Sequence, residues 1–541
     1  MKQALINGKI YIEKGTFEEA VLIDEDKILK TGSNGEILAS AGADCKVYDC
    51  GGKTVLPGLN DSHLHLLQVG MMLNMAPIDK SRSIEHMIEI CKTYMKENPE
   101  RVKKSLHALG WNQELFTEGE KRMPTRYDLD HISTEIPIVL ERICGHAVSV
   151  NSRILEMAGI TSENHCFEGG EFLLDECGEP NGICTENAAE YIKTFLPAKE
   201  TQEIEQDLLA AMKYCVEHGI TSVQSNDVGN SFGEPKQLNH ILQSIYHDGK
   251  ALLRYHSQAT YRSIPEFEAF LENDWKNNRC GHDSWLTQGT LKLFKDGSLG
   301  AKTAMMKNGY IDEKDNHGVD CLPKEELEKM CVLASQHGVQ VAVHCIGDKA
   351  IEETIDCFEK GFIDKKNKLR HAIVHCQITD KNLLDRIIKE DISVLAQPVF
   401  IDFDMNIVES LCGKELEETS YAFGTLLKNG VHLSYGTDSP VEDCNPFDNI
   451  YMAVTRKNRA GKPEGGYNPK ECVDIETAID AYTMESAYNQ FQEDKKGRLK
   501  PGYDADLTVI DRDIFTCDKS EIRNILPVLT MTGGKIVYQK Y

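Results

Sequence analysis

No run of about 18 consecutive apolar residues occurs in this sequence, so no segment of it is expected to span a bilayer as a helix. The N-terminal segment MKQALINGKIYIEKG also lacks the apolar stretch of a signal peptide. No cluster of Lys and Arg offsets the formal net charge of −26, and nucleic-acid binding needs such clusters to displace counterions from phosphates. We therefore expect a cytoplasmic protein without a membrane or nucleic-acid partner.

Closely spaced cysteine pairs are missing as well. The 18 cysteines are scattered without a CxxC pair, whereas a disulfide framework is typical of short secreted chains. Most of them are expected to be reduced, half-buried thiols.

What the sequence does contain is an ordinary globular composition, with 41% apolar and 27% charged residues. Its 541 residues suit several domains of roughly 150 residues, or one large barrel with attachments.

Eight short apolar runs, separated by helical stretches, follow one another through the chain. Strands that alternate with helices form parallel βαβ units, and eight such units close into a (β/α)8 TIM barrel with its chemistry at the carboxyl ends of the strands. The runs are TVLPGLNDSHLH, GITSVQS, ALLRYHS, TLKLFKDGS, VQVAVHCIG, LRHAIVHCQ, ISVLAQP and VHLSYGTDSP. We expect this α/β barrel to occupy residues 55–499.

The two chain ends share a different pattern. Short alternating strands broken by Gly, Asp and Asn fill the N-terminal segment, and the strand-like runs ADLTVIDRD and GGKIVYQK repeat this pattern near the C-terminus. Strand pairs at the two ends of a chain often join. We therefore predict a composite β-sandwich domain made of residues 1–54 and 500–541.

The connection after the first barrel strand is unusually long. Roughly 150 residues separate the first candidate strand from the second, far more than an ordinary loop contains. Helices are expected around residues 84–97 and 200–217, and EIPIVLERICGHAVSVNS is typical of a strand and turn. An inserted subdomain of approximately residues 75–215 is therefore predicted, lying over the barrel mouth.

Polar donors stand at the ends of several candidate strands. His63 and His65 are two residues apart, so the period of two in a strand sends both imidazoles to one face. That pair alone is weak evidence, but His344, His375 and Asp438 also end candidate strands, at the edge where a barrel builds its site. Nitrogen and oxygen donors of this kind suit zinc, with iron, manganese or nickel as alternatives. We expect one or two divalent metals per chain.

Three other histidines also lie in candidate strands. His371 has the same facing as His375 but lies deeper, so His375 is preferred as the ligand. His256 and His432 do not match the carboxyl edge, which favours core or hydrogen-bonding roles for both.

The run TLKLFKDGS is predicted to send one lysine into the barrel. Leu291 and Leu293 take the opposite face from Lys292, whereas Lys295 faces the other way and is a poor alternative. Burial lowers the pKa of a lysine, and the neutral amine can take up carbon dioxide to form a carbamate. Carboxylated Lys292 would be an anionic ligand bridging two metals about 3.5 to 4 Å apart. The alternative left open is a lysine that pairs with Asp296 or extends to solvent.

The chain resembles the amidohydrolase superfamily, and within it the YtcJ-like, or amidohydrolase family 3, proteins that include N-substituted formamide deformylases. The similarity extends over nearly the whole chain. It covers the ordered words VLPGLNDSHLHL, GWNQELF, MPTRYDLD, GHAVSVNS, GITSVQS, KLFKDGSLGAKTA, HCIGDKA, GTDSPVEDCNPF and LKPGYDADLTVID.

The resemblance implies a (β/α)8 barrel, a β-sandwich from both chain ends, and six metal-ligand positions. These positions match the residues selected above, namely His63, His65, Lys292, His344, His375 and Asp438. Two departures stand nearby: Val374 occupies the place of a common Glu, and Thr437 that of a common Ser. Neither removes a ligand, although the first is expected to alter hydrogen bonding around the metals.

The expected function is that of a metal-dependent hydrolase acting on carbon–nitrogen bonds other than peptide bonds, the EC 3.5 type. Water activated at the metal would attack an amide or N-substituted formamide, and Asp438 would serve as the catalytic proton carrier. Alternatives are a deaminase or cyclic-amide hydrolase using the same site and, more remotely, a non-catalytic scaffold. The sequence leaves the substrate open.

The sequence motifs shared with the family also suggest residues that contact a small-molecule substrate. Most of them lie in the insertion, and a structural role is an equal alternative for each. They are Trp111, His146, Asn151, Glu186 and, after the lysine strand, Asp296. The oligomeric state is open, with a homodimer as one option.

Overall fold

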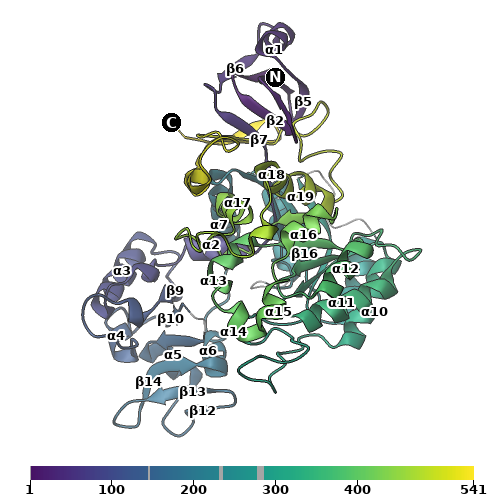
Figure 1. Cartoon of the computed structure of the whole chain (residues 1–541). Helices are drawn as coiled ribbons and strands as arrows, with labels where there is room; N and C mark the ends of the chain where they lie inside the picture. Colours follow the sequence, from purple (N-terminus) through teal and green to yellow (C-terminus); the bar gives the residue numbers. More distant parts are fainter. Residues whose placement is uncertain (1, 144–145, 231–234, 277–284, 541) are drawn as a thin grey trace. The chain divides into compact units, whose positions relative to one another are not determined.

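The computed structural model describes residues 2–143, 146–230, 235–276 and 285–540 (Figure 1). The chain forms two compact units, one made of Met1–Val69 and Leu208–Tyr541, and the other of Gly70–Asp207. None of the helices within these described ranges is long and apolar enough to cross a membrane. Every described cysteine is a free thiol.

The first unit is built on an eight-stranded sheet in which all neighbouring strands are parallel. The strand order is β21-β20-β19-β18-β17-β16-β15-β8. All eight predicted barrel strands are therefore confirmed. Their bounds are β8 Leu59–Leu64, β15 Ile220–Ser225, β16 Arg254–Ala259, β17 Leu286–Phe294, β18 Gln340–Cys345, β19 Ala372–His375, β20 Ser393–Ala396 and β21 Leu433–Tyr435.

The first and last strands of this sheet meet just beyond the end of β21. There the backbone N–H of Asp438 donates to the carbonyl of His63 at 2.8 Å, and the hydroxyl of Thr437 donates to Asp61 at 2.6 Å. Gly436 is required at this seam, since a Cβ there would lie 2.6 Å from the backbone nitrogen of His63. The sheet thus forms a TIM-like near-barrel, and the seam lies beside the predicted metal ligands.

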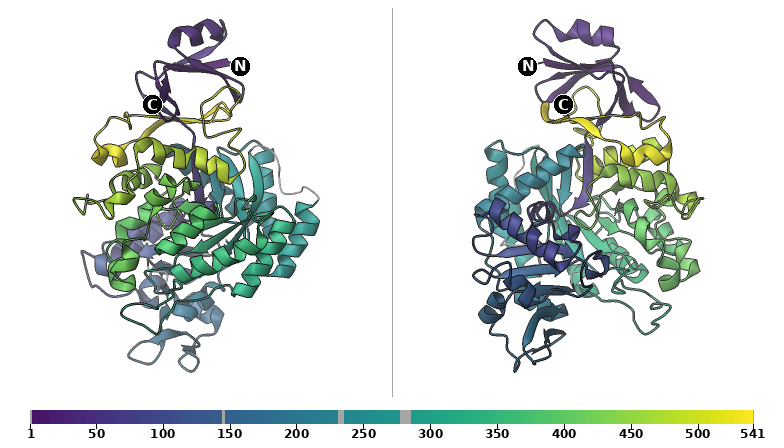
Figure 2. Two further views of the ribbon diagram at one scale, coloured as in Figure 1. Left: turned by 45° about the vertical axis from the view of Figure 1, so that its right-hand side comes forward. Right: turned by 90° about the vertical axis from the view of Figure 1, so that its left-hand side faces the viewer.

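Amphipathic helices follow the barrel strands and cover the sheet (Figure 2). The pattern in α12 (Lys381–Lys389) shows why: Leu383, Leu384 and Ile387 recur on one buried face, and Asp380 caps the N-terminus by accepting from the backbone N–H of Leu383. The other main helices in this series are α8 Pro235–His247, α9 Ile264–Phe270, α10 Lys324–Gln336, α11 Asp348–Gly361, α16 Phe423–Lys428 and α17 Pro446–Thr455.

The two chain ends meet in a pair of sheets, as predicted (Figure 1). β22 (Leu507–Ile510) pairs antiparallel with β7 (Thr54–Pro57) in a six-stranded sheet of order β24-β23-β22-β7-β2-β3. Its other strands are β2 Lys9–Glu13, β3 Thr16–Glu18, β23 Pro527–Thr532 and β24 Lys535–Gln539. A four-stranded sheet of order β5-β4-β1-β6 comes entirely from the N-terminal segment, with bounds β1 Lys2–Ile6, β4 Ala20–Asp24, β5 Lys27–Gly32 and β6 Lys46–Asp49. One apolar core joins strands of both sheets and includes Leu5, Ile10, Val21, Ile23, Val55, Leu507 and Met531. β7 continues the composite sheet to Pro57, beyond the predicted limit at residue 54.

The second unit has a sheet of its own, with strand order β12-β13-β14-β11-β10-β9. Four of its strands are β9 Leu106–Trp111, β12 Cys166–Phe167, β13 Gly170–Leu174 and β14 Pro180–Thr185. The predicted strand and turn are the antiparallel pair β10 (Ile138–Arg142) and β11 (Ala147–Val150), with residues 144–145 outside the described ranges. α3 (Ile84–Glu97) confirms one predicted helix here, and α7 (Thr201–Glu217) confirms the other. The position of this insertion over the barrel mouth stays a prediction.

Candidate metal centre

Three of the predicted ligands come together at the carboxyl end of β8. His63, His65 and Asp438 each offer one ligand atom, and these atoms lie within 4.8 Å of one another. Oδ1 of Asp438 lies 3.4 Å from Nε2 of His63 and 3.2 Å from Nε2 of His65. All three side chains are buried. The arrangement places two imidazole nitrogens and one carboxylate oxygen around a common point.

The donor atoms of this cluster fit a divalent metal. Oδ1 of Asp438 is buried and has no hydrogen-bond partner in the described structure. A buried carboxylate oxygen in this state is energetically unfavourable unless a cation binds it. Burial lowers the pKa of His63 to about 3, so its imidazole is neutral and can act as a ligand. Burial would raise the pKa of Asp438, but the close imidazoles of His65, His375 and His63 hold it below its usual range.

His344 and His375 adjoin this cluster. The ring centroids of His344 and His375 lie 4.5 Å apart, and those of His375 and His63 lie 5.7 Å apart. Both rings are shielded from solvent, and burial lowers the pKa of His344 to about 4 and holds the pKa of His375 well below its usual value. Burial therefore keeps the imidazoles of His63, His344 and His375 neutral, whereas the carboxylate of Asp438 raises the pKa of His65 despite its burial. Nε2 of His344 donates to the carbonyl of Gly297 at 2.9 Å, which leaves Nδ1 as the nitrogen that can bind a metal.

Lys292 on β17 is fully buried next to this group. Its Nζ lies 3.7 Å from the centroid of the Phe294 ring and 3.4 Å from the carbonyl oxygen of Leu293. Burial lowers its pKa to about 7, against a partial opposing effect of Asp438. Among the described residues Lys292 forms no ion pair, and a fully buried side chain does not extend to solvent. The structure thus supports neither alternative that the sequence left open for this lysine.

Asp296, the other half of that alternative, has different partners. Its carboxylate accepts backbone N–H bonds from Met305 at 2.9 Å, Ile346 at 3.0 Å and Gly347 at 2.8 Å. These bonds fasten the loop after β17 to the loop after β18. Burial raises its pKa to about 7. The carboxylate of Asp296 therefore has the structural role of joining these two loops. Its contact with substrate stays a prediction.

Two glutamines that the sequence pattern does not predict orient two of the histidines. Oε1 of Gln258 lies 2.7 Å from Nδ1 of His63, and its Nε2 donates to the carbonyl of Ser62. Since the amide is thereby oriented, Oε1 must accept from Nδ1–H, and Nε2 of His63 keeps its lone pair for a metal. Gln397 holds His375 in the same way at 2.8 Å, with its Nε2 donating to the carbonyl of Leu395.

The third histidine uses a main-chain partner instead. Nδ1 of His65 lies 3.0 Å from the carbonyl oxygen of Asn226, which also leaves Nε2 as its donor atom. Asp61 supports the same region by accepting from the backbone N–H of His63 at 3.1 Å and from the hydroxyl of Thr437. Thr437 keeps the hydroxyl that a serine would offer here, so this departure from the family pattern leaves the bond intact.

We expect Gln258→Ala and Gln397→Ala each to weaken metal binding by about 10–100-fold, because a histidine without its oriented partner loses basicity and a fixed tautomer. Competition with a chromogenic chelator measures this affinity. Gln224→Ala is the matched control, since this buried barrel glutamine donates only to the carbonyl of Ser486. Equal metal affinity in all three variants and the wild type would contradict the assigned role.

The remaining histidines of the barrel strands have their own partners. His371 bonds the hydroxyl of Ser335 at 2.9 Å and accepts from the backbone N–H of Val341 at 3.1 Å. His256 bonds two threonine hydroxyls, and His432 lies 2.8 Å from Glu485. These contacts are consistent with core and hydrogen-bonding roles.

The other candidate substrate residues belong to the second unit. Trp111 is fully buried and donates through Nε1 to the carbonyl of Leu140 at 2.8 Å. Asn151 caps α5 (Ser152–Ala158) by accepting from the backbone N–H of Ile154. His146 and Glu186 are exposed and bond each other at 2.9 Å, with Glu186 at φ +49°. Trp111 and Asn151 thus have visible structural roles, and contact of any of these four residues with substrate stays a prediction.

Comparison with known proteins agrees with this geometry. The sequence profile of one family, described as "Amidohydrolase family", matches residues 46–538. The chain is 30% identical to "Putative amidohydrolase YtcJ" of Bacillus subtilis over the full length of both proteins. It is also 25% identical to the N-substituted formamide deformylase of Arthrobacter pascens, covering 96% of this chain and 95% of that protein.

A solved structure resembles the whole chain. It is an uncharacterized metal-dependent hydrolase from Pyrococcus furiosus, 27% identical, with a TM-score of 0.79. The match covers 95% of the present chain and 100% of the other. Fold, sequence and the buried His63, His65 and Asp438 cluster therefore agree on one class of protein.

Proposed function

The chain belongs to the amidohydrolase family, and on this premise we propose that it hydrolyses the carbon–nitrogen bond of an amide or N-substituted formamide, an EC 3.5 type of reaction. The observation that carries the proposal is the buried cluster of His63, His65 and Asp438, in which the carboxylate oxygen Oδ1 has no hydrogen-bond partner among the described residues. The formamide deformylase among the relatives supports the substrate class.

We propose zinc as the metal, because two or three imidazoles with a carboxylate are typical zinc donors. His63, His65 and Asp438 would hold one ion. Lys292, carboxylated on Nζ, would join His344 and His375 in holding a second. Bound there, a divalent metal supplies Lewis acidity that polarises a carbonyl oxygen and lowers the pKa of water.

The chain's own groups account for the proton movements. Asp438 is ionised at neutral pH because its pKa lies below the usual range, so its carboxylate can accept a proton from the attacking water. The same carboxylate then returns the proton to the leaving nitrogen. Asp61 and the seam bond from Asp438 N–H to the carbonyl of His63 keep this carboxylate in place. Burial of the whole cluster excludes bulk water, which strengthens every one of these electrostatic contacts.

Two other functions share the same site. A deaminase or cyclic-amide hydrolase would use the same ligands and differ only in the pocket walls. A scaffold without activity would be expected to have lost ligands, whereas His63, His65 and Asp438 stand within ligand distance of one another.

Metal analysis by mass spectrometry of freshly purified protein tests the ligand set. We expect nearly two equivalents of divalent metal per chain, one at each predicted group of three ligands. One equivalent would agree with the hydrolase reaction and would leave Lys292 without its proposed role as a metal ligand. No metal, even after addition of zinc and bicarbonate, would overturn the proposal.

A product assay then separates the reaction types. The metal-loaded protein is incubated with N-substituted formamides, acyl amides, cyclic amides and amino-purines, and formate, carboxylic acid and ammonia are measured. Formate or acid release supports the proposed hydrolysis of an amide. Ammonia alone would assign the deaminase reaction instead.

A further inference from the structure

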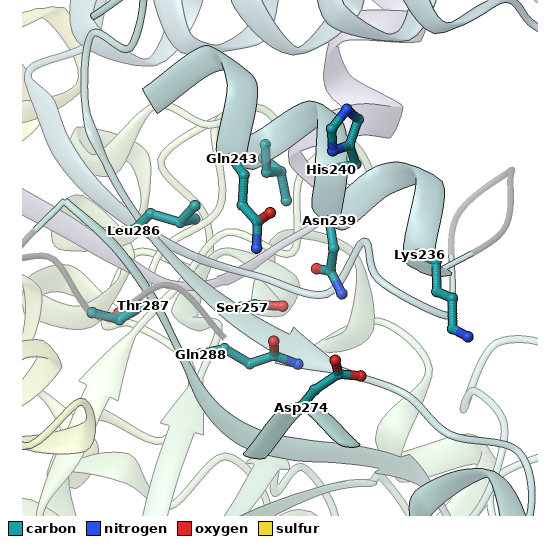
Figure 3. A pocket seen from close by; sticks show the side chains of 10 residues that line it. Lys236, Asn239, His240, Gln243, Ser257, Asp274, Leu286, Thr287 and Gln288 are labelled. Carbon is teal, nitrogen blue, oxygen red and sulfur yellow. The ribbon is translucent and has the colours of Figure 1, made fainter. Parts of the chain in front are cut away.

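A second pocket lies on the other face of a strand that serves the metal centre. On β16, Gln258 bonds His63, whereas the preceding residue Ser257 lines this pocket, as expected from the alternation of side chains along a strand. The walls come from α8, β16, the start of β17 and the π-helical turn η3 (Leu271–Trp275) (Figure 3). The volume of about 480 Å³ is in the range of small-molecule sites.

The floor of this pocket holds a polar group that lacks a partner. Ser257 is only 2% exposed, and its Oγ makes no hydrogen bond in the described structure. Buried hydroxyls are nearly always bonded, because an unmet one loses its hydration without compensation. Ser257 therefore offers an unpaired hydroxyl at the floor of the pocket.

The walls carry one positive and one negative side chain, Lys236 and Asp274, which do not pair with each other. Within the described ranges, neither Lys236 on α8 nor Asp274 on η3 forms an ion pair or a side-chain hydrogen bond. Figure 3 shows both side chains toward one end of the pocket, with Asn239 next to them. π-helical turns are rare and occur mostly where function needs them, and here such a turn presents Asp274 to the pocket.

The rest of the described lining favours a polar ligand. Among the lining residues that the structure describes, Leu242 and Leu286 are the apolar ones, and the others offer amide, imidazole or hydroxyl groups, namely Asn239, His240, Gln243, Thr287 and Gln288. A simple anion would face the carboxylate of Asp274, and a simple cation would face the ammonium of Lys236. A ligand that carries both charges satisfies both walls.

We propose that this pocket binds a small zwitterion of the amino-acid type. Its carboxylate pairs with Lys236, its ammonium group pairs with Asp274, and a polar side chain reaches the hydroxyl of Ser257 and the neighbouring amides. The site is separate from the metal ligands and does not depend on the reaction proposed for them.

Isothermal titration calorimetry of the full chain with each protein amino acid in turn tests the proposal. We expect saturable binding of at least one polar amino acid with a Kd of about 1 mM or lower. The N-acetylated and the carboxamide forms of that amino acid should bind at least about 10-fold more weakly, since each lacks one charge-assisted bond. Absence of binding by every amino acid would overturn the proposal, as would equal binding of the three forms.

Variants locate the binding. Lys236→Met and Asp274→Asn should each weaken it by about 10-fold or more, whereas Lys213→Met, which removes an exposed lysine of α7, should leave it unchanged. Ser257→Ala should weaken binding without lowering the melting temperature of the ligand-free protein, because the hydroxyl has no partner to lose.

A metal-site variant distinguishes this pocket from the proposed active site. Asp438→Asn should bind the amino acid as the wild type does, whatever its effect on hydrolysis. Binding that is lost in Asp438→Asn and kept in Lys236→Met would place the ligand at the metal centre and overturn the second site.

Discussion

Asp438→Asn is expected to lower kcat by about 10²–10⁴-fold, the contribution of a well-placed general acid–base group. The carboxylate lies 3.4 and 3.2 Å from Nε2 of His63 and His65, and its Oδ1 has no hydrogen-bond partner in the described structure. Asparagine has nearly the same shape but cannot take up a proton at neutral pH. The measurement is kcat for the substrate found in the product assay, together with metal content.

Asp443→Asn provides the matched control, because Asp443 follows in the same loop and its carboxylate bonds only the hydroxyl of Tyr214 at 2.8 Å and backbone at Asn445. We expect its kcat to stay close to that of the wild type. An Asp438→Asn enzyme that retains both its metal and an undiminished kcat would show that another group carries the proton.

The barrel could be predicted because its signal repeats. Each of the eight strands is a short apolar run followed by a polar residue or turn, and all eight appear in the structure. His63 and His65 were also within reach of sequence reasoning, since strand alternation alone brings their rings together. The ring centroids lie 5.4 Å apart.

His375 shows where strand alternation stops being sufficient. The register pairs His344 with Val374, so on a regular strand Val374 would share the face of His344. Val374 instead packs with Ala342, Ala372 and Leu395 in an apolar cluster. His375 reaches the centre because its backbone turns at φ +74°, and Asp438 turns likewise at φ +56°. Positive φ at residues other than glycine is uncommon, and the sequence pattern does not predict it at His375 or Asp438.

The glutamines were missed for a different reason. Gln258 and Gln397 lie at the carboxyl ends of the third and seventh barrel strands, so their positions alone were compatible with a role in the site. A glutamine side chain is compatible with many roles, and its function here depends on the carbonyls of Ser62 and Leu395 that orient each amide. Asp296 poses the same difficulty, since two of its three backbone donors come from the loop after the next strand.

Lys292→Met is expected to remove one equivalent of metal per chain and to abolish the carbamate. Methionine fills the same buried volume, so packing is retained while the nitrogen that takes up carbon dioxide is lost. Metal analysis gives the stoichiometry, and 13C NMR of protein prepared with labelled bicarbonate detects the carbamate in the wild type alone. Lys295→Met is the control: Lys295 bonds Asp320 at 2.6 Å and Glu353 at 2.8 Å, so its loss should lower stability and leave the metal content unchanged.

The metal-free forms separate this role from simple packing. Burial lowers the pKa of Lys292 from 10.5 to about 7, so below pH 7 the folded wild type holds a buried ammonium that methionine would relieve. Lys292→Met should therefore be the more stable metal-free protein at low pH. Its advantage should shrink as pH rises from about 7 to about 10.5, where only the unfolded wild type still binds the proton. Urea unfolding across this range measures the difference, and an advantage that grows with pH, or full metal content in Lys292→Met, would show that Lys292 is not the buried amine of the metal centre.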